Sequence, residues 1–282
     1  MRFELIDSLS LPGNPDKPND DAFGFADSVA VVLDGATGLG EPLMPGKSDA
    51  AWLARFGANR LLAHAKEGNP PREAVRHALE DAQKSFDALR RREPAERYEL
   101  PFASLMFASV TGSGFEALWF GDCAALVRRP DGSVDLIGEA IAKRELEAAR
   151  VAQLAAKHGL SPAAGTNRPE YLAALRRARN FVNTEKGGWL FGPDPRAADH
   201  VAGRQVDVPA GSLVLLMTDG FLALVSDYRR YTAAKLIEAA NTVGLKTLGE
   251  ELRAIETDDR EGKAFPRFKT SDDATALLLR LA

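Results

Sequence analysis

The sequence predicts an α+β domain in which antiparallel strands are combined with separate helices. Short apolar segments rich in β-branched residues recur between turn signals, which is typical of strands. They cover residues 29–33, 102–110, 115–120, 124–127, 213–217 and 274–281. Pro130-Asp131-Gly132 lies between two of the strand-like segments and favours an antiparallel hairpin. This pattern argues against a doubly wound parallel sheet.

Helical patterns occupy other stretches of the chain. The first begins at Ser48, a candidate N-cap, and runs to about residue 66. The second begins at Pro71 and runs to about residue 91, since proline suits the first helical turn. A polar block over about 139–179 is helical by composition and is interrupted at Gly159 and Pro162. Two further helices are expected at 233–241 and 247–255.

Length and composition favour one domain with an insertion. A chain of 282 residues, 45% of them hydrophobic, can bury a substantial core. We expect a single domain over residues 1–282, with a helical lid or flap inserted at about 139–200. The formal net charge of -4 argues against a basic surface, so no nucleic-acid or membrane partner is expected.

Cysteine content and hydropathy bear on the compartment. Cys123 is the single cysteine, which excludes an internal disulfide and a zinc site built from several thiolates. The opening residues lack the pattern of a secretory signal, and no apolar run approaches the roughly 20 residues that span a bilayer. We therefore predict a soluble cytoplasmic protein.

Aspartates recur at the ends of the predicted strands. Asp20 and Asp21 precede residues 22–26, Asp34 follows 29–33, Asp219 follows 213–217, and Asp272 and Asp273 precede 274–281. An unpaired charge at the end of a buried strand is costly, so the repeated placement calls for compensation by a cation. Any single Asp-Gly pair is explained as well by a turn, so the interpretation rests on the four sites together.

An all-aspartate set suits hard divalent cations. Mg²⁺ and Mn²⁺ prefer carboxylate, carbonyl and water oxygens, whereas zinc prefers nitrogen and sulfur. Two such ions about 4 Å apart can hold a phosphoryl oxygen and lower the pKa of a water molecule that they share. A nucleophilic serine, cysteine or histidine is then not required.

The order of the aspartate motifs is also informative. The chain contains NDDAF, LDGATG, FGDCA, LLMTDGF and SDDAT in that order. This series resembles the motifs of the PP2C protein serine/threonine phosphatases over nearly the whole chain. The resemblance implies a four-layer α/β/β/α sandwich of two antiparallel sheets, with the metal site at one edge. It also implies two divalent cations, Mn²⁺ or Mg²⁺, and allows a weaker third metal.

The resemblance also implies roles for individual residues. Asp34 corresponds to the carboxylate that bridges both metals and positions the attacking water, and Gly35 to the residue that offers its backbone carbonyl. The remaining metal ligands implied by the resemblance are Asp21, Asp219 and Asp272.

Three further aspartates take a second rank in this comparison. Asp20 resembles a residue that acts through water, and Asp122 resembles the aspartate associated with the third metal. Asp273 stands where many relatives have asparagine, which places it behind the ligands.

The chain departs from the family at three positions. Asp16 stands where the family usually has an arginine for the substrate phosphate, and Lys17 is the nearest cation. A lysine attracts phosphate as a point charge, without the bidentate fork of arginine. Ala36 replaces a histidine that could serve as a general acid, and the GDCA sequence lacks the arginine of the corresponding motif.

The predicted activity is hydrolysis of phosphoserine and phosphothreonine in proteins, with a phosphorylated protein, the target of a cognate kinase, as the partner. A phosphatase for small phosphate esters would use the same chemistry. A catalytically weak module that binds a phosphorylated partner is a further alternative. The missing arginine and histidine favour such a module, and the aspartate set opposes it.

Three other patterns have simpler explanations. Gly46-Lys47-Ser48 lacks the earlier glycine of a phosphate-binding loop, so Ser48 is interpreted as a helix cap. Cys123 and Arg129 have the spacing of cysteine-dependent phosphatases, but the intervening AALVR has the pattern of a strand. Arginines 176, 177 and 179 could contact an acidic partner, but an ordinary solvated helical face is the preferred interpretation.

Overall fold

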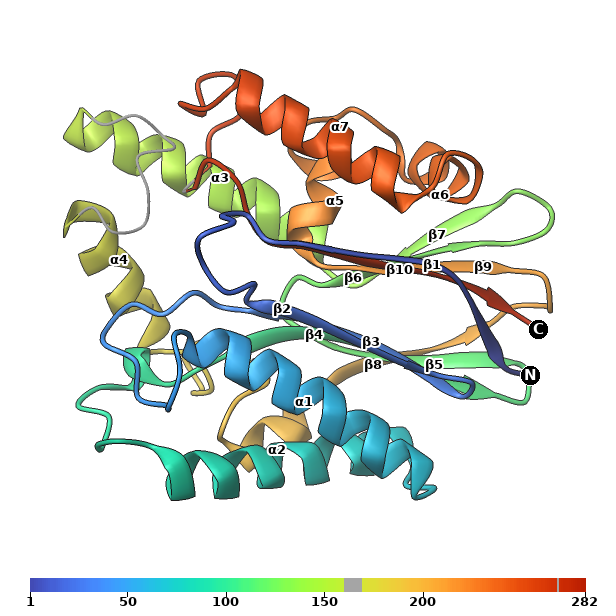
Figure 1. Cartoon of the computed structure of the whole chain (residues 1–282), viewed down its shortest axis with the longest axis horizontal. Helices are drawn as coiled ribbons and strands as arrows, with labels where there is room; N and C mark the ends of the chain where they lie inside the picture. The colour runs from blue at the N-terminus through green and yellow to red at the C-terminus, as the bar shows by residue number, and fades with distance from the viewer. Residues whose placement is uncertain (160–168, 268) are drawn as a thin grey trace.

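Two five-stranded antiparallel sheets pack face to face, and helices cover both outer faces (Figure 1). The computed structural model describes residues 1–159, 169–267 and 269–282. The strand order is β1-β10-β9-β6-β7 in one sheet and β2-β3-β4-β5-β8 in the other. The four-layer α/β/β/α sandwich expected from the motif series is therefore confirmed.

The first sheet has its most apolar strands at the centre. Its strands are β1 (Phe3–Leu11), β6 (Ala124–Arg128), β7 (Val134–Ile137), β9 (Leu213–Met217) and β10 (Ala274–Leu281). All five residues of β9 are buried because the strand has neighbours on both edges and layers on both faces. The predicted hairpin turn is confirmed, since the Arg129 N–H donates to the Ser133 carbonyl between β6 and β7.

The second sheet carries the first aspartate motifs. Its strands are β2 (Asp21–Ala26), β3 (Val29–Gly35), β4 (Ala103–Thr111), β5 (Gly114–Phe120) and β8 (Ala202–Asp207). Strand β3 lies between β2 and β4, so Asp34 near its end has strand residues on both sides. Apolar side chains of the two sheets fill the space between them.

The sequence patterns missed two strands, β1 and β8. Both are edge strands, and β8 reads AGRQVD, with only Val206 fully buried. An edge strand has a neighbour on one side only and can carry polar residues, which weakens the apolar signal.

The outer helices lie where the sequence predicts them. Helices α1 (Asp49–Lys66) and α2 (Pro71–Leu89) pack on the second sheet. Helices α6 (Ala233–Thr242) and α7 (Leu245–Asp258) pack on the first. Ser48 is the N-cap of α1, because its Oγ accepts a hydrogen bond from the Ala51 N–H. None of the helices in the described ranges is both long and apolar enough to cross a bilayer.

One prediction about β9 needs correction. The strand ends at Met217, and Asp219 is the first residue of a helix, α5 (Asp219–Ser226), rather than the last residue of the strand. Thr218 has the extended backbone of an N-cap residue, and six residues of the helix are buried. A short helix that is apolar on most faces lacks the alternation of apolar and polar residues by which a helix is recognised. Its sequence therefore looked like a continuation of the apolar strand before it.

Helices α3 (Ala140–His158) and α4 (Pro169–Arg179), which lie between β7 and β8 in the chain, reach the end of the sandwich opposite both chain termini (Figure 1). The same segment contains a 3-10 helix, η2 (Pro195–His200); another 3-10 helix, η1 (Arg97–Glu99), precedes β4. Helix α3 ends at the predicted break, where Gly159 has a φ of 63°. The break predicted at Pro162 lies outside the described residues, and the lid role of 139–200 stays a prediction.

Candidate metal centre

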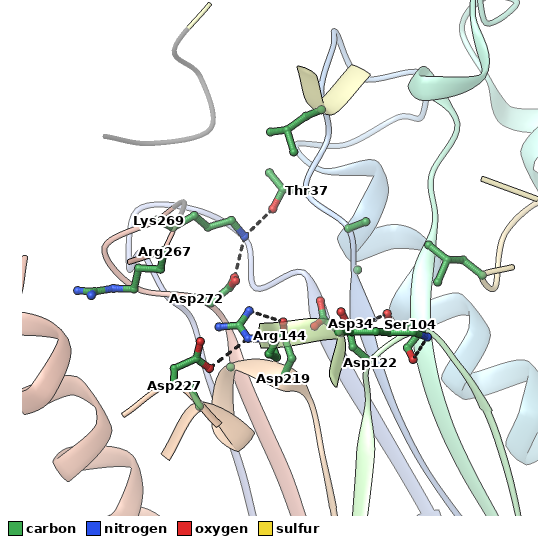
Figure 2. A pocket seen from close by; sticks show the side chains of 18 of the residues that line it. Asp34, Thr37, Ser104, Asp122, Arg144, Asp219, Asp227, Arg267, Lys269 and Asp272 are labelled. Carbon is green, nitrogen blue, oxygen red and sulfur yellow. Dashed lines mark hydrogen bonds and ion pairs between the residues drawn. The ribbon is translucent and has the colours of Figure 1, made fainter. Parts of the chain in front are cut away.

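Three carboxylates meet at the end of the sandwich near α3 (Figure 2). One carboxylate oxygen from each of Asp34, Asp122 and Asp219 lies within 4.8 Å of the other two. Asp34 comes from β3, Asp122 from the turn between β5 and β6, and Asp219 from the start of α5. We call these three residues the aspartate cluster.

Strand register brings Asp122 to Asp34. Ser104 on β4 is the direct strand partner of Asp34. Its hydroxyl donates a hydrogen bond of 2.5 Å to Asp122 Oδ1, so one residue aligns a carboxylate on a strand with one in a turn. Figure 2 shows the three side chains side by side.

Two glycines next to the aspartates are required by close packing. Gly121 has a φ of 70°, and a Cβ there would lie 2.1 Å from Ser104 Oγ. A Cβ on Gly220 would lie 2.0 Å from the Asp273 carbonyl oxygen. Side chains at these positions would displace the backbone that carries Asp122 and Asp219.

Asp21 lies behind the aspartate cluster and is buried, with an exposure of 4%. It is the direct strand partner of Asp34. Its Oδ2 accepts a hydrogen bond of 2.8 Å from Thr218 Oγ1, whereas its Oδ1 has no hydrogen-bond partner in the described part of the chain. An unpartnered buried carboxylate oxygen is costly, which is consistent with a nearby cation.

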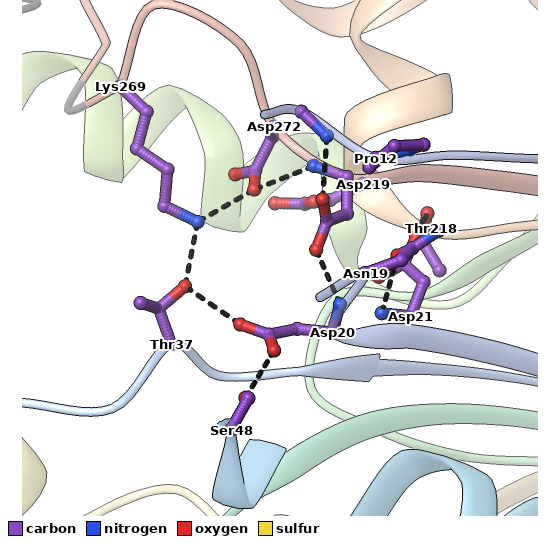
Figure 3. Close-up of polar contacts among 12 residues, drawn as sticks. Pro12, Asn19, Asp20, Asp21, Thr37, Ser48, Thr218, Asp219, Lys269 and Asp272 are labelled. Carbon is purple, nitrogen blue, oxygen red and sulfur yellow. Dashed lines mark hydrogen bonds and ion pairs between the residues drawn. The ribbon is translucent and has the colours of Figure 1, made fainter. Parts of the chain in front are cut away.

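Asp272 lines the same cavity and is paired with a lysine. The Lys269 ammonium donates to Asp272 Oδ1 at 2.7 Å and to Thr37 Oγ1 at 3.0 Å (Figures 2 and 3). Asp272 is therefore near the aspartate cluster but is held by a cationic side chain from its own loop.

Helix α3 contributes a second cation. Arg144 donates from Nη1 to Asp219 Oδ2 at 2.7 Å and from Nε to Asp227 Oδ2 at 3.1 Å. Its side chain is only 12% exposed. A buried guanidinium bridging two carboxylates holds the start of α3 against α5.

The aspartates of second rank have structural partners. Asp20 accepts a hydrogen bond from the Ser48 hydroxyl (Figure 3). Asp273 accepts from the backbone N–H groups of Gly13 at 2.7 Å and Asp20 at 2.6 Å. Asp273 thus joins the loop before β10 to the loop before β2.

Two adjoining cavities share a wall. One, of about 410 Å³, is lined by Asp34, Asp122, Asp219 and Asp272, and we call it the aspartate cavity. The other, of about 750 Å³, is lined by the segment that contains Asp16 and Lys17. The residues that line both are Ala36, Thr37, Leu39, Lys269 and Asp272. Lys17 is exposed and does not line the aspartate cavity.

Burial and like charge dominate the electrostatics of the aspartate cluster. Burial raises the pKa of Asp34 well above its usual range, and the carboxylates of Asp219 and Asp21 raise it further. Burial also raises the pKa of Asp219 to about 6, although Arg144 opposes that shift. For Asp272, Lys269 outweighs the effect of burial and lowers the pKa.

The cluster therefore fits divalent cations. Its donors are all carboxylate oxygens, which suit Mg²⁺ and Mn²⁺ better than zinc. Protonation or bound cations must reduce the repulsion among three carboxylates that are this close. The raised pKa values of Asp34 and Asp219 have the same cause, since protonation removes negative charge from the cluster when no cation does so.

The arginines of α4 correct one expectation. Arg176 Nε donates to the Leu39 carbonyl at 2.8 Å, and Arg179 Nη1 donates to the Thr37 carbonyl at 2.6 Å. Burial lowers the pKa of Arg179 to about 10, which still leaves it charged at neutral pH. The predicted solvated face was wrong for these two residues, because carbonyls of the loop after β3 draw them inward.

The interpretation of the cysteine agrees with the structure. Cys123 is fully buried between the sheets, and burial followed by the charge of Asp34 raises the pKa of its thiol. Arg129 instead forms an ion pair with Asp135 beside the hairpin turn. A nucleophilic thiolate is disfavoured in such a setting.

Sequence reasoning missed four residues that shape the site: Ser104, Arg144, Thr218 and Lys269. Lys269 carried a weak signal, since it is three residues before Asp272 in a charged loop. The two hydroxyl residues carried none, because each meets its aspartate through the tertiary fold.

The sequence profile described as protein phosphatase 2C matches residues 14–255. This chain belongs to the protein phosphatase 2C family. It is therefore a metal-dependent protein phosphatase, as the motif order predicted. The matched range contains the whole aspartate cluster.

Solved structures of PP2C-type phosphatases share the fold. The Mycobacterium tuberculosis serine/threonine phosphatase PstP/Ppp is 16% identical, with a TM-score of 0.58 over 100% of this chain and 99% of the other. A PstP catalytic domain in complex with two manganese ions is 17% identical, with a TM-score of 0.57 over 100% and 99%. PppA, a regulatory component of T6SS in Pseudomonas aeruginosa, is 14% identical, with a TM-score of 0.57 over 100% and 99%. No curated protein matches the chain.

Proposed function

We propose that this PP2C protein removes phosphate from phosphoserine and phosphothreonine residues of proteins in the aspartate cavity. The observation that carries the proposal is the meeting of Asp34, Asp122 and Asp219 from three distant parts of the chain. The family assignment supports an enzyme over a phosphate-binding module. No contact in the described residues favours small phosphate esters as the substrate.

The metal ligands in this proposal are Asp34, Asp122, Asp219 and Asp272, with the backbone carbonyl of Gly35. Asp34 lies between Asp122 and its strand partner Asp21, which suits the central, bridging position. The sequence suggested Asp21 as a further ligand; because Asp21 does not line the aspartate cavity, we propose that it supports the site through its hydrogen bond with Thr218. The two manganese ions of the PstP structure support two cations, and metal titration will choose between Mn²⁺ and Mg²⁺. Divalent cations bound here supply Lewis-acid activation of water for attack on phosphorus.

Other side chains of the cavity have proposed roles in substrate binding. Apolar residues from the 175–190 segment, including Leu175, Val182 and Trp189, line the cavity beside the carboxylates. This wall would contact the substrate next to its phosphorylated residue. Ala36 cannot donate a proton, so the oxygen of the leaving group takes its proton from solvent in this scheme.

The first test is metal-dependent hydrolysis. Wild-type protein should hydrolyse an aryl phosphate with Mn²⁺ or Mg²⁺ and lose that activity in chelator. Asp34→Asn and Asp219→Asn should each lower kcat at least about 100-fold, because each removes a charge that the cations need. The matched control is Asp258→Asn, at an exposed aspartate outside both cavities. Full activity of Asp34→Asn would rule out the proposed site.

A second assay addresses the substrate. Phosphoserine and phosphothreonine peptides should be hydrolysed with a higher kcat/KM than the aryl ester, since the apolar wall offers contacts that a small ester does not use. A higher kcat/KM for the aryl ester than for the peptides would indicate a small phosphate ester as the substrate instead of a protein. The cognate kinase and the cytoplasmic location stay predictions.

A further inference from the structure

The loop before β10 places a lysine in the wall shared by both cavities. Lys269 Nζ lies 2.7 Å from Asp272 Oδ1 and 3.0 Å from Thr37 Oγ1 (Figure 3). We propose that Lys269 binds the phosphate group of the substrate and positions it over the aspartate cluster. This inference rests on the proposed function.

The loop that carries Lys269 is anchored. Arg267 is 9% exposed and donates to the Asp259 carboxylate at 2.8 Å, the Phe265 carbonyl at 2.8 Å and the Thr270 carbonyl at 3.0 Å. These contacts connect Arg267 to residues on both sides of it in the chain, from Asp259 to Thr270. Lys269 therefore lies between two residues, Arg267 and Thr270, that are hydrogen-bonded to each other. A side chain on a backbone held in this way loses less conformational entropy when it binds a ligand.

Other cations of the aspartate cavity are engaged with the protein scaffold. Lys143 donates to the Gly121 carbonyl at 2.7 Å, Arg144 bridges Asp219 and Asp227, Arg179 donates to the Thr37 carbonyl, and Arg267 holds its own loop. Arg144 also contacts a proposed metal ligand, Asp219, but it stays paired with the carboxylate of Asp227. Lys269 differs because its partner besides the proposed ligand Asp272 is the neutral hydroxyl of Thr37. An ammonium has three N–H groups, so it can keep its bond to Thr37 and still contact phosphate.

The charge balance of the cavity gives Lys269 its role. Four of the carboxylates that line the cavity are proposed metal ligands, and two divalent cations would neutralise these four. A phosphate monoester brings up to two further negative charges, which cationic side chains have to meet. When Asp272 binds a cation, the ammonium beside it becomes available to the phosphate. Lys269 thus neutralises the carboxylate of Asp272 before a metal ion binds. After metal binding it neutralises part of the charge on the substrate phosphate.

The same geometry favours Lys269 over Lys17 for this role. Lys17 is exposed and lines the neighbouring cavity together with Asp16. The wall formed by Thr37 and Lys269 lies between that cavity and the aspartate cluster. The phosphate contact predicted from the sequence at Lys17 is therefore reassigned to Lys269.

The test is the binding of inorganic phosphate to Mn²⁺-saturated protein, measured by calorimetry. Lys269→Met should weaken phosphate binding at least about tenfold and raise KM for a phosphopeptide more than it lowers kcat. Lys269→Arg should restore part of the affinity, because it keeps the charge. Mn²⁺ affinity should be unchanged or higher in Lys269→Met, since a competing cation is gone.

The matched control is Lys263→Met. Lys263 belongs to the same loop, is exposed and pairs with Glu261, so its removal should leave phosphate affinity unchanged. Unaltered phosphate affinity in Lys269→Met, a parallel fall in Mn²⁺ affinity, or a loss in Lys17→Met instead would overturn the inference. Wild-type protein without metal-dependent turnover would instead refute the proposed function, which keeps the two failures distinct.

Discussion

Asp21 and Asp34 are direct partners across the antiparallel strands β2 and β3. One of the pair is buried behind the cluster, and the other lines the aspartate cavity. Paired residues of neighbouring strands lie on the same face of a sheet, so the two carboxylates repel each other at short range. This repulsion is one cause of the raised pKa of Asp34, after burial and Asp219.

Stability of the cation-free protein should fall as pH rises. The folded-state pKa values of Asp21 and Asp34 are raised well above the ordinary value of 3.8, and that of Asp219 is raised to about 6. The folded state therefore binds more protons than the unfolded state above about pH 4, and that advantage is lost as pH rises through the folded-state values. Thermal melts in chelator should show Tm falling between about pH 5 and pH 7.5.

Two comparisons sharpen this prediction. Asp34→Asn should show a shallower fall than wild type, whereas Asp258→Asn should follow wild type. Added Mn²⁺ should raise the Tm of wild-type protein most at the alkaline end of the range, because the ligands must be deprotonated. A Tm in chelator that rises steadily over this range would contradict the prediction.

Ser104→Ala should weaken metal binding. The hydroxyl aligns Asp122 with Asp34, so its removal leaves the Asp122 carboxylate free to rotate. Loss of such a supporting contact should raise the Mn²⁺ concentration for half-maximal activity about tenfold. Activity and calorimetric titrations with Mn²⁺ both measure this. Ser109→Ala, on the same strand but outside the aspartate cavity, is the control, and coincident titrations of all three proteins would contradict the predicted role.

Gly220→Ala should destabilise the protein by about 2 kcal/mol, because the new methyl group collides with the carbonyl oxygen of Asp273. Either α5 or the loop before β10 must move, so Asp219 and Asp272 should separate and activity should fall with stability. Denaturant unfolding and aryl phosphate hydrolysis measure the two effects. At Gly112 a Cβ would meet nothing within 4 Å, so Gly112→Ala should have little effect. A Gly220→Ala protein as stable as wild type would show that the backbone adjusts without strain.

Local patterns predicted much of the fold. The bounds of β9 and β10 agree with the predicted segments because both strands lie inside the sheet and are mostly apolar. Edge strands β1 and β8 were missed because solvent accepts their polar residues. The helix that begins at Asp219 was not predicted, because a short buried helix has no polar face that would reveal its period.

The candidate site was less accessible from the sequence. Each strand-end aspartate could be recognised singly, because a charge beside an apolar run is a local feature. The contact between Asp122 and Ser104 could not be recognised from the sequence, because the two residues are 18 positions apart and meet only through the alignment of β4 with β5. The contact between Lys269 and Thr37 spans 232 residues, and only the packing of the two loops creates it.

The aspartate cluster takes one member from the second sheet, one from the helix that follows β9 of the first sheet, and one from the connection between the sheets. Asp34 belongs to the second sheet, Asp219 follows β9 of the first, and Asp122 lies where the chain crosses over from β5 to β6. A cation bound by all three aspartates would connect the two sheets to each other. A small shift of one sheet relative to the other would increase the distances among the three carboxylates before either sheet unfolded. Core substitutions far from the cavity can therefore abolish activity while the protein stays folded.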